Sequence, residues 1–153
     1  MTTAIFPGSF DPFTKGHLDI LEQASKMFDK VIVAVAFNPE KKGFLSVDRR
    51  LLIIKECVKN IQNVEVDSFD GLTVNYAENK GANILIRGIR NSKDFEYELE
   101  LAQINKELNG NISTIFLIPK TENIFVSSSA VRELLNNDGD ISAFVPQNAI
   151  KFF

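Results

Sequence analysis

The sequence predicts an α/β fold in which an open, five-stranded parallel sheet carries helices on both faces. Segments with strand and helix patterns alternate along the 153 residues, which is typical of repeated βαβ units with right-handed crossovers. The strand segments show little polar alternation, as expected where helices cover both faces of a sheet. Unusual polar clusters directly follow the strands, where open α/β sheets bind ligands. Together these observations indicate a Rossmann-like domain.

Local patterns support the individual elements in order. The first strand is a short apolar run, and the second reads Val-Ile-Val-Ala-Val-Ala-Phe. Ser46 precedes the second helix and Asp48 lies in its first turn, while Ser92 and Asp94 open the fourth helix and Gly110 follows it. We expect strands at 3–6, 31–37, 64–66, 84–87 and 115–118, and helices at about 17–28, 47–60, 72–80, 93–109, 128–136 and 147–152.

Composition limits the class of protein. A chain of 153 residues that is 44% hydrophobic can bury one core, so we expect a single domain over residues 1–153. The net charge of −3 argues against bulk nucleic-acid binding. No apolar run reaches the ~20 residues that cross a membrane, and no signal-peptide pattern is present. The lone Cys57 cannot form an internal disulfide, so we expect a cytoplasmic protein with an inert thiol.

Several common functional motifs are absent from the sequence. It has no G-x-x-x-x-G-K-[ST] segment, which excludes a P-loop kinase. It has no G-x-G-x-x-G segment after a strand, so a dinucleotide-dependent oxidoreductase is disfavoured. It also has no Cys/His cluster that would form a structural zinc site.

The predicted strand order places two polar clusters beside one crevice. If the order is 3-2-1-4-5, the first and fourth strands are neighbours at the point where the order reverses. Ligands bind at such a point, beyond the carboxyl ends of the strands. We therefore expect His17 and the segment 87–90 to face the same crevice.

The loop Gly8–His17 joins the first strand to the first helix and predicts a phosphate site. Glycines allow close approach of the backbone, and free N–H groups with the helix dipole favour negative charge. His17, the only histidine, could donate a hydrogen bond to a phosphate oxygen as charge develops. The alternative for His17 is a capping or core histidine.

Three further clusters offer groups for phosphate. Arg87 and Arg90 end the fourth strand and could bind phosphate bidentately; the alternative is ion pairing with acids of the next helix, such as Asp94. Lys41 and Lys42 follow the second strand and could equally be solvated. The triple serine 127–129 could offer hydroxyls and free N–H groups, serve as an N-cap, or do both.

The 93–109 helix carries two apolar stripes on opposite sides. One stripe can pack on the sheet, and the other needs a cover, which indicates a subunit interface. Glu98 and Asn105 share one edge between the stripes, where solvated polar residues are the alternative interpretation. The stripes consist of Phe95, Leu99 and Ala102, and of Tyr97, Leu101, Ile104 and Leu108.

Three motifs resemble those of a known enzyme family. Gly8-Ser9-Phe10-Asp11-Pro12 with Thr14-Lys15-Gly16-His17 resembles the T/H-x-G-H signature of the nucleotidyltransferase superfamily. Arg87-Gly88-Ile89-Arg90 followed by Asp94-Phe95-Glu96-Tyr97-Glu98, and Phe125-Val126-Ser127-Ser128-Ser129, resemble the bacterial phosphopantetheine adenylyltransferases. The order and spacing of these motifs match along nearly the whole chain.

The resemblance implies a reaction and its partners. ATP and 4′-phosphopantetheine would give 3′-dephospho-CoA and pyrophosphate, the penultimate step of coenzyme A synthesis. The substrate phosphate would attack the α-phosphorus in line, without a covalent intermediate, and Mg²⁺ would neutralise the phosphates without an assigned protein ligand. The family also implies a cytoplasmic homohexamer, and feedback by coenzyme A is plausible because product and substrate share the pantetheine arm. Nucleic acid and membrane are not expected partners.

The resemblance also assigns roles to matching positions. It implies that His17 stabilises the transition state, and that Lys41 and Arg90 act with it at the reacting centre. The ATP contacts carried over are Ser9, Phe10, His17, Gly88, Ile89, Arg90, Glu98, Asn123, Ile124, Phe125, Val126, Ser127, Ser128 and Ser129. The substrate contacts carried over are Ser9, Lys41, Thr73, Arg87 and Asn105.

The chain departs from the family pattern at a few positions, and two alternative functions stay open. Relatives often carry an aromatic residue at 123 and serine at 124, where this chain has Asn123 and Ile124, and Arg132 replaces a frequent lysine. Another superfamily member, such as a cytidylyltransferase or a nicotinamide mononucleotide adenylyltransferase, would share the first motif. A non-catalytic CoA- or ATP-sensing protein on this fold would be expected to have lost His17, Lys41 or Arg90.

Overall fold

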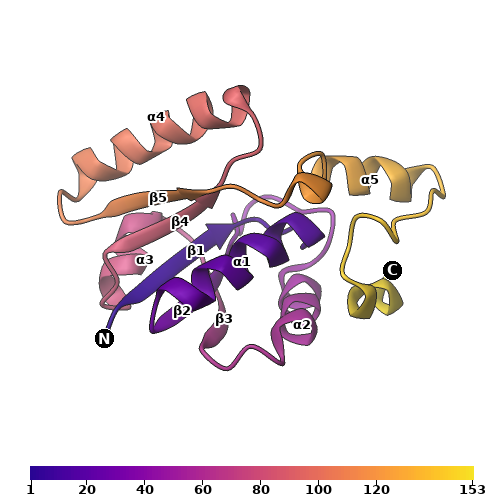
Figure 1. Cartoon of the computed structure of the whole chain (residues 1–153), viewed down its shortest axis with the longest axis horizontal. Coiled ribbons are helices and arrows are strands. Elements are labelled where there is room, and N and C mark those ends of the chain that lie inside the picture. The colour runs from indigo at the N-terminus through magenta and orange to yellow at the C-terminus, as the bar shows by residue number, and fades with distance from the viewer.

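The computed structural model describes residues 1–153 and shows one five-stranded parallel sheet with helices on both faces (Figure 1). The strand order is β3-β2-β1-β4-β5, so the predicted fold and order are confirmed. The order reverses between β1 and β4, which are paired through Ala4↔Ile84 and Ile5↔Leu85. The strands are β1 Thr3–Gly8, β2 Lys30–Ala36, β3 Val64–Phe69, β4 Ile84–Gly88 and β5 Ser113–Leu117.

The helices follow the predicted positions with instructive shifts at their ends. Helix α1 begins at Lys15 rather than at residue 17, because Thr14 and not a later residue caps it. Asn91 caps α4 through its side chain, so Ser92 is the first helical residue and not the cap. The helices are α1 Lys15–Met27, α2 Val47–Val58, α3 Thr73–Asn79, α4 Ser92–Leu108 and α5 Ser128–Asn136, with 3-10 turns η1 Thr121–Asn123 and η2 Gln147–Phe152.

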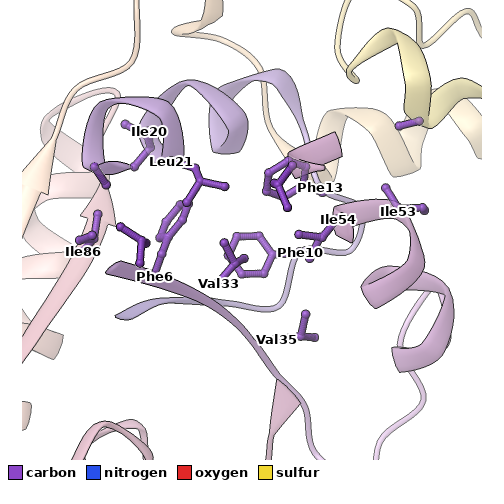
Figure 2. Close-up of a cluster of buried hydrophobic side chains, with 14 of the residues drawn as sticks. Phe6, Phe10, Phe13, Ile20, Leu21, Val33, Val35, Ile53, Ile54 and Ile86 are labelled. Atoms are coloured by element: carbon purple, nitrogen blue, oxygen red, sulfur yellow. The ribbon is translucent and has the colours of Figure 1, made fainter. Parts of the chain in front are cut away.

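Two apolar layers sandwich the sheet. On one face, alternate residues of β1 and β2 pack with α1, α2 and the C-terminal segment; on the other, they pack with α3. Figure 2 shows the rings of Phe6, Phe10 and Phe13 among aliphatic side chains of α1, β2 and α2. The loop after β1 is therefore anchored in the core by its own aromatic side chains.

Helix α4 packs differently from the prediction. The expectation that one apolar stripe packs on the sheet is met only in part. The ring of Phe95 packs edge-on against Phe116 of β5, with centroids 5.7 Å apart, and Ala102 is half-buried, whereas Leu99 is exposed. The buried residue of this helix is Glu98, at 7% exposure, on the edge between the stripes. Glu98 thus reaches the sheet through Arg87 of β4, and most apolar side chains on both flanks of α4 are exposed within one chain.

None of the helices combines the length and the low polarity that a membrane span requires. Cys57 in α2 is half-buried, and burial raises the pKa of its thiol to about 12. A thiol with that pKa is protonated at neutral pH, which agrees with the inert role expected for it.

Candidate active site

A cleft of about 410 Å³ opens at the carboxyl ends of β1 and β4, where the strand order reverses. The N-termini of α1 and α5 border it, so their first-turn N–H groups and dipoles favour an anion. His17 and Arg90 both line this cleft, as the predicted strand order required. The segments that line it are 6–10, the start of α1, the end of β4 with Arg90, the polar edge of α4, and 126–129 with Arg132.

His17 is held by a capping box at the start of α1. The Thr14 hydroxyl accepts the His17 N–H at 3.3 Å, and the Nδ1 atom of His17 accepts the Thr14 N–H at 3.0 Å. Because Nδ1 is the acceptor, the neutral ring carries its proton on Nε2. Nε2 has no hydrogen bond within the chain, yet no buried polar side-chain atom lacks a partner. Nε2–H therefore reaches open space in the cleft as an unused donor.

The surroundings of His17 keep its ring neutral. The ring packs against Phe10 and Phe13, with centroids 4.9 and 5.6 Å away. Burial lowers the pKa of His17 to about 3, and the positive charges of Arg87 and Arg90 act in the same direction. Phe10 also lines the cleft but is only 2% exposed, because its ring belongs to this cluster. The imidazole is thus a neutral, oriented hydrogen-bond donor.

We expect the pKa of His17 to be measurable without assignment ambiguity, because it is the only histidine. Its ring proton resonances should not titrate between pH 8 and roughly 5 in the folded protein. The unfolded chain binds a proton near pH 6.5 and the folded chain only near pH 3, so stability should fall as pH drops through this window. A proton NMR titration checks this, and a midpoint above pH 6 would contradict it.

Arg87 and Arg90 are both paired with carboxylates of α4. Arg87 binds Glu98 bidentately, with Nε–Oε2 and Nη2–Oε1 distances of 2.7 Å, and donates a third hydrogen bond from Nη1 to the Pro7 carbonyl. Arg90 binds Asp94 with an Nε–Oδ2 distance of 2.9 Å. The alternative interpretation of ion pairing is therefore realised, yet all four side chains line the cleft. The pairs fix the guanidinium planes while leaving further N–H groups for a ligand.

A side cavity of about 160 Å³ adjoins the cleft and shares its Pro7, Gly8, Arg87 and Glu98 wall. It extends between β1, α3 and the polar edge of α4. The predicted substrate contacts Thr73 and Asn105 line the side cavity alone, whereas Arg87 and Glu98 line both spaces. The expected nucleotide contacts that line the cleft are Ser9, Phe10, His17, Gly88, Arg90, Glu98, Val126, Ser127, Ser128 and Ser129.

Five predicted residues line neither space. Lys41 is exposed on the β2–α2 loop, residues 37–46. The backbone N–H of Ile89 already donates to the Leu117 carbonyl next to β4. Asn123 turns outward, with its side-chain amide 3.4 Å from the Asp19 carboxylate on α1. Ile124 is half-buried outside the cleft, and Phe125 is 71% exposed.

The structure adds Thr14, Asp94 and Arg132 to the cleft. Arg132 donates from Nη1 to the Asp11 carbonyl at 2.9 Å and from Nη2 to the Ser129 hydroxyl at 3.1 Å, and has no carboxylate partner. It is therefore the cleft arginine whose charge is uncompensated. Its place three residues after Ser129, on the same face of a helix, was a sequence signal for this role.

The fold and this cleft define a class of nucleotide-handling α/β proteins, and residues 5–134 match the family model described as cytidylyltransferase-like. A solved structure from Vibrio parahaemolyticus, proposed to be a nicotinate-nucleotide adenylyltransferase, has the same fold with a TM-score of 0.74 at 20% identity, covering 99% of this chain and 91% of that one.

Full-length relatives identify the family within this class. Proteins named phosphopantetheine adenylyltransferase from Nautilia profundicola and Clostridium novyi are 49% and 45% identical, over 98% and 99% of this chain and 97% and 94% of their own lengths. A third, from Alkaliphilus oremlandii, is 48% identical over 99% of this chain and 96% of its own. The chain belongs to the phosphopantetheine adenylyltransferase family, and it is a nucleotidyltransferase.

Proposed function

We propose that this enzyme transfers the adenylyl group of ATP to 4′-phosphopantetheine, giving 3′-dephospho-CoA and pyrophosphate. The observation that carries the proposal is the pair of spaces that meet at the Arg87–Glu98 wall. The reaction needs a polyphosphate site and a site for a long, mostly neutral arm, with the reacting phosphates where the two meet. The names of the full-length relatives support the same substrates.

The cleft suits a triphosphate. Two helix N-termini border it, Ser127 to Ser129 line it at the start of α5, and Arg132 supplies a positive charge that no carboxylate neutralises. The side cavity suits the pantetheine arm, because Leu101 and Ala102 offer apolar surface while Thr73 and Asn105 offer groups that can bind amides.

In the proposed mechanism, the substrate phosphate attacks the α-phosphorus in line, without a covalent intermediate. Catalysis then consists of positioning and charge stabilisation. The Nε2–H of His17 donates to the phosphoryl oxygens as charge builds. Arg90 fixes the nucleotide phosphates, and Lys41 is brought to the substrate phosphate from the β2–α2 loop. The resemblance also assigns nucleotide contacts to Ile89 and to residues 123–125, which line neither space. To make those contacts, residues 123–125 have to turn toward the cleft.

Mg²⁺ is proposed to enter with ATP. The chain has no group of three or more acidic, histidine or cysteine side chains that could hold a metal ion, and Asp94 and Glu98 are already paired with arginines. This fits an ion carried by substrate phosphates and water, the usual coordination of Mg²⁺ in such sites. When bound, the ion supplies charge neutralisation of the phosphates.

The experiment that tests the function is pyrophosphate release from ATP and Mg²⁺, with and without 4′-phosphopantetheine. Release that depends on 4′-phosphopantetheine supports the proposal. Preference for CTP, or for nicotinamide mononucleotide as acceptor, would assign the chain to another activity of the superfamily. Binding of ATP without release would favour the sensing protein.

We also propose that the enzyme is a cytoplasmic homohexamer. The assembly is supported by the exposed apolar side chains on the flanks of α4. Tyr97, Ile104 and Leu108 are 61%, 49% and 54% exposed and lie along one side of this helix, and a contiguous exposed apolar strip is typical of an interface. Sedimentation should give a mass near six times 17.1 kDa. Leu99→Lys should lower that mass by placing a charge on an apolar flank, whereas Lys93→Ala on the same helix should not. A monomer mass for the wild-type chain would contradict the hexamer.

Feedback by coenzyme A is proposed for the same site. Coenzyme A carries the pantetheine arm of the substrate, so it should occupy the side cavity and compete with 4′-phosphopantetheine. Inhibition that excess 4′-phosphopantetheine does not relieve would contradict a shared site.

A further inference from the structure

The turn around Lys41 is held by local hydrogen bonds only. These bonds run from the Lys41 N–H to the Asn38 carbonyl and from the Glu40 N–H to the Asn38 side chain. Neither bond ties the turn to the cleft. Upstream, the loop leaves β2 at Phe37, whose N–H still pairs with Phe69. The position of Lys41 therefore depends on how the downstream end of the loop is fixed.

A buried ion pair fixes that end. The Asp11 carboxylate accepts the N–H of Phe44 at 2.7 Å and the N–H of Leu45 at 2.8 Å. Arg50, from the first turn of α2, lies 3.8 Å from the same carboxylate. Asp11 and Arg50 are 8% and 5% exposed, so both charges are held out of water.

Arg50 connects the loop to the nucleotide side of the cleft as well. It donates to the Leu45 carbonyl at 3.1 Å and to the Ser9 carbonyl at 3.0 Å. Ser9 lines the cleft, so one guanidinium joins the β2–α2 loop to the wall of the site. A planar five-donor group can make these contacts at once, which a lysine cannot.

Gly43, two residues after Lys41, leaves the room that this arrangement needs. A Cβ at Gly43 would lie 2.6 Å from Nη2 of Arg50 and 2.9 Å from Oδ2 of Asp11. Oδ2 of Asp11 is held by the Phe44 N–H, and Nη2 belongs to a guanidinium whose Nε and Nη1 both donate to carbonyls, so neither atom can yield freely. Only glycine allows the loop to pass this close to the ion pair.

We propose that Asp11, Arg50 and Gly43 form a clamp that positions Lys41 for the substrate phosphate. The inference rests on the proposed function, because it takes Lys41 as a substrate contact. These three are positioning residues, which act through Lys41 and do not touch the substrate. The alternative, a buried ion pair that serves the fold alone, predicts lost stability without a specific change in catalysis.

The test is Gly43→Ala, alone and combined with Lys41→Ala, with Gly110→Ala as the matched control because a Cβ there meets no atom within 4 Å. We expect Gly43→Ala to lower kcat/KM for 4′-phosphopantetheine by about tenfold or more, since misplacement by about 1 Å can cost a hundredfold. The calorimetric Kd for ATP should stay within about twofold. On the Lys41→Ala background the same change should lower kcat/KM by less than about twofold.

The outcomes separate this inference from the proposed function. Additive losses in the double variant, or an equal loss of ATP affinity, would overturn the clamp while leaving the adenylyltransferase intact. A wild-type enzyme with no release dependent on 4′-phosphopantetheine would overturn the proposed function, and the clamp with it. Arg50→Lys provides a second variant, because it keeps the charge beside Asp11 but cannot reach both carbonyls; it should reproduce the non-additive pattern.

Discussion

Replacing His17 by alanine is expected to lower turnover by about 10²–10³ while the fold persists, the range for losing one oriented donor to developing charge. The ring is neutral, its Nδ1 is taken by the Thr14 N–H, and its Nε2–H is free in the cleft. The loss should appear in kcat for pyrophosphate release at saturating substrates. Wild-type turnover in this variant would remove His17 from the mechanism.

A second substitution distinguishes chemistry from capping. His17→Ala also removes the side-chain half of the capping box, the bond from the Thr14 N–H to Nδ1, which should cost about 1 kcal/mol of stability as one lost hydrogen bond. Glutamine is a usual residue at this position of a capping box, so His17→Gln should keep the cap and the thermal stability. Its amide offers an N–H donor near the position of Nε2, but on a flexible side chain in place of the rigid ring, so turnover should stay well below wild type. Recovery of activity in His17→Gln would mean that a positioned N–H donor, and not the imidazole itself, is what matters.

The fold could be predicted because its signals are local and mutually consistent. Apolar strands in β1, β2 and β4, polar clusters after each strand, and a capping serine at Ser46 all indicate the same sheet. Helix α4 escaped this reasoning. Its apolar stripes predict a helix that packs on the sheet through one stripe, and Phe95 of the first stripe does contact Phe116 of β5. The best-buried residue of the helix is instead Glu98, because Arg87 at the end of β4 is a cation that needs a carboxylate partner. No sequence pattern shows which of these two effects prevails.

The site could be predicted where backbone topology alone brings residues together. His17 and Arg90 meet because neighbouring parallel strands end at the same edge, and this follows from strand order. Asn123 illustrates the limit, because its contact with Asp19 depends on which way a short 3-10 turn faces. The clamp at Asp11 is a further example: its partners lie 33 and 34 residues away, and nothing in the spacing reveals them.

The second large effect is expected at the Arg87–Glu98 ion pair, which lines both spaces. Arg87→Met should lower the free energy of unfolding by about 3 kcal/mol, which corresponds to a fall of roughly 6–12 °C in the melting temperature. The reason is that Glu98, at 7% exposure, would lose the guanidinium that binds both of its carboxylate oxygens. Activity should also fall, because Arg87 lines both spaces. Thermal unfolding measures the first loss, and an unchanged melting temperature would contradict it.

The double variant Arg87→Met/Glu98→Leu separates the two losses. Replacing a buried ion pair by apolar side chains of similar size is often neutral for stability, so the melting temperature should return to within a few degrees of wild type. Three N–H groups of Arg87 are used inside the protein, and the two that remain are those proposed to bind phosphate. No apolar pair can replace these, so pyrophosphate release should stay at least about a hundredfold below wild type. Recovery of both stability and activity would show that the pair only holds α4 against the sheet.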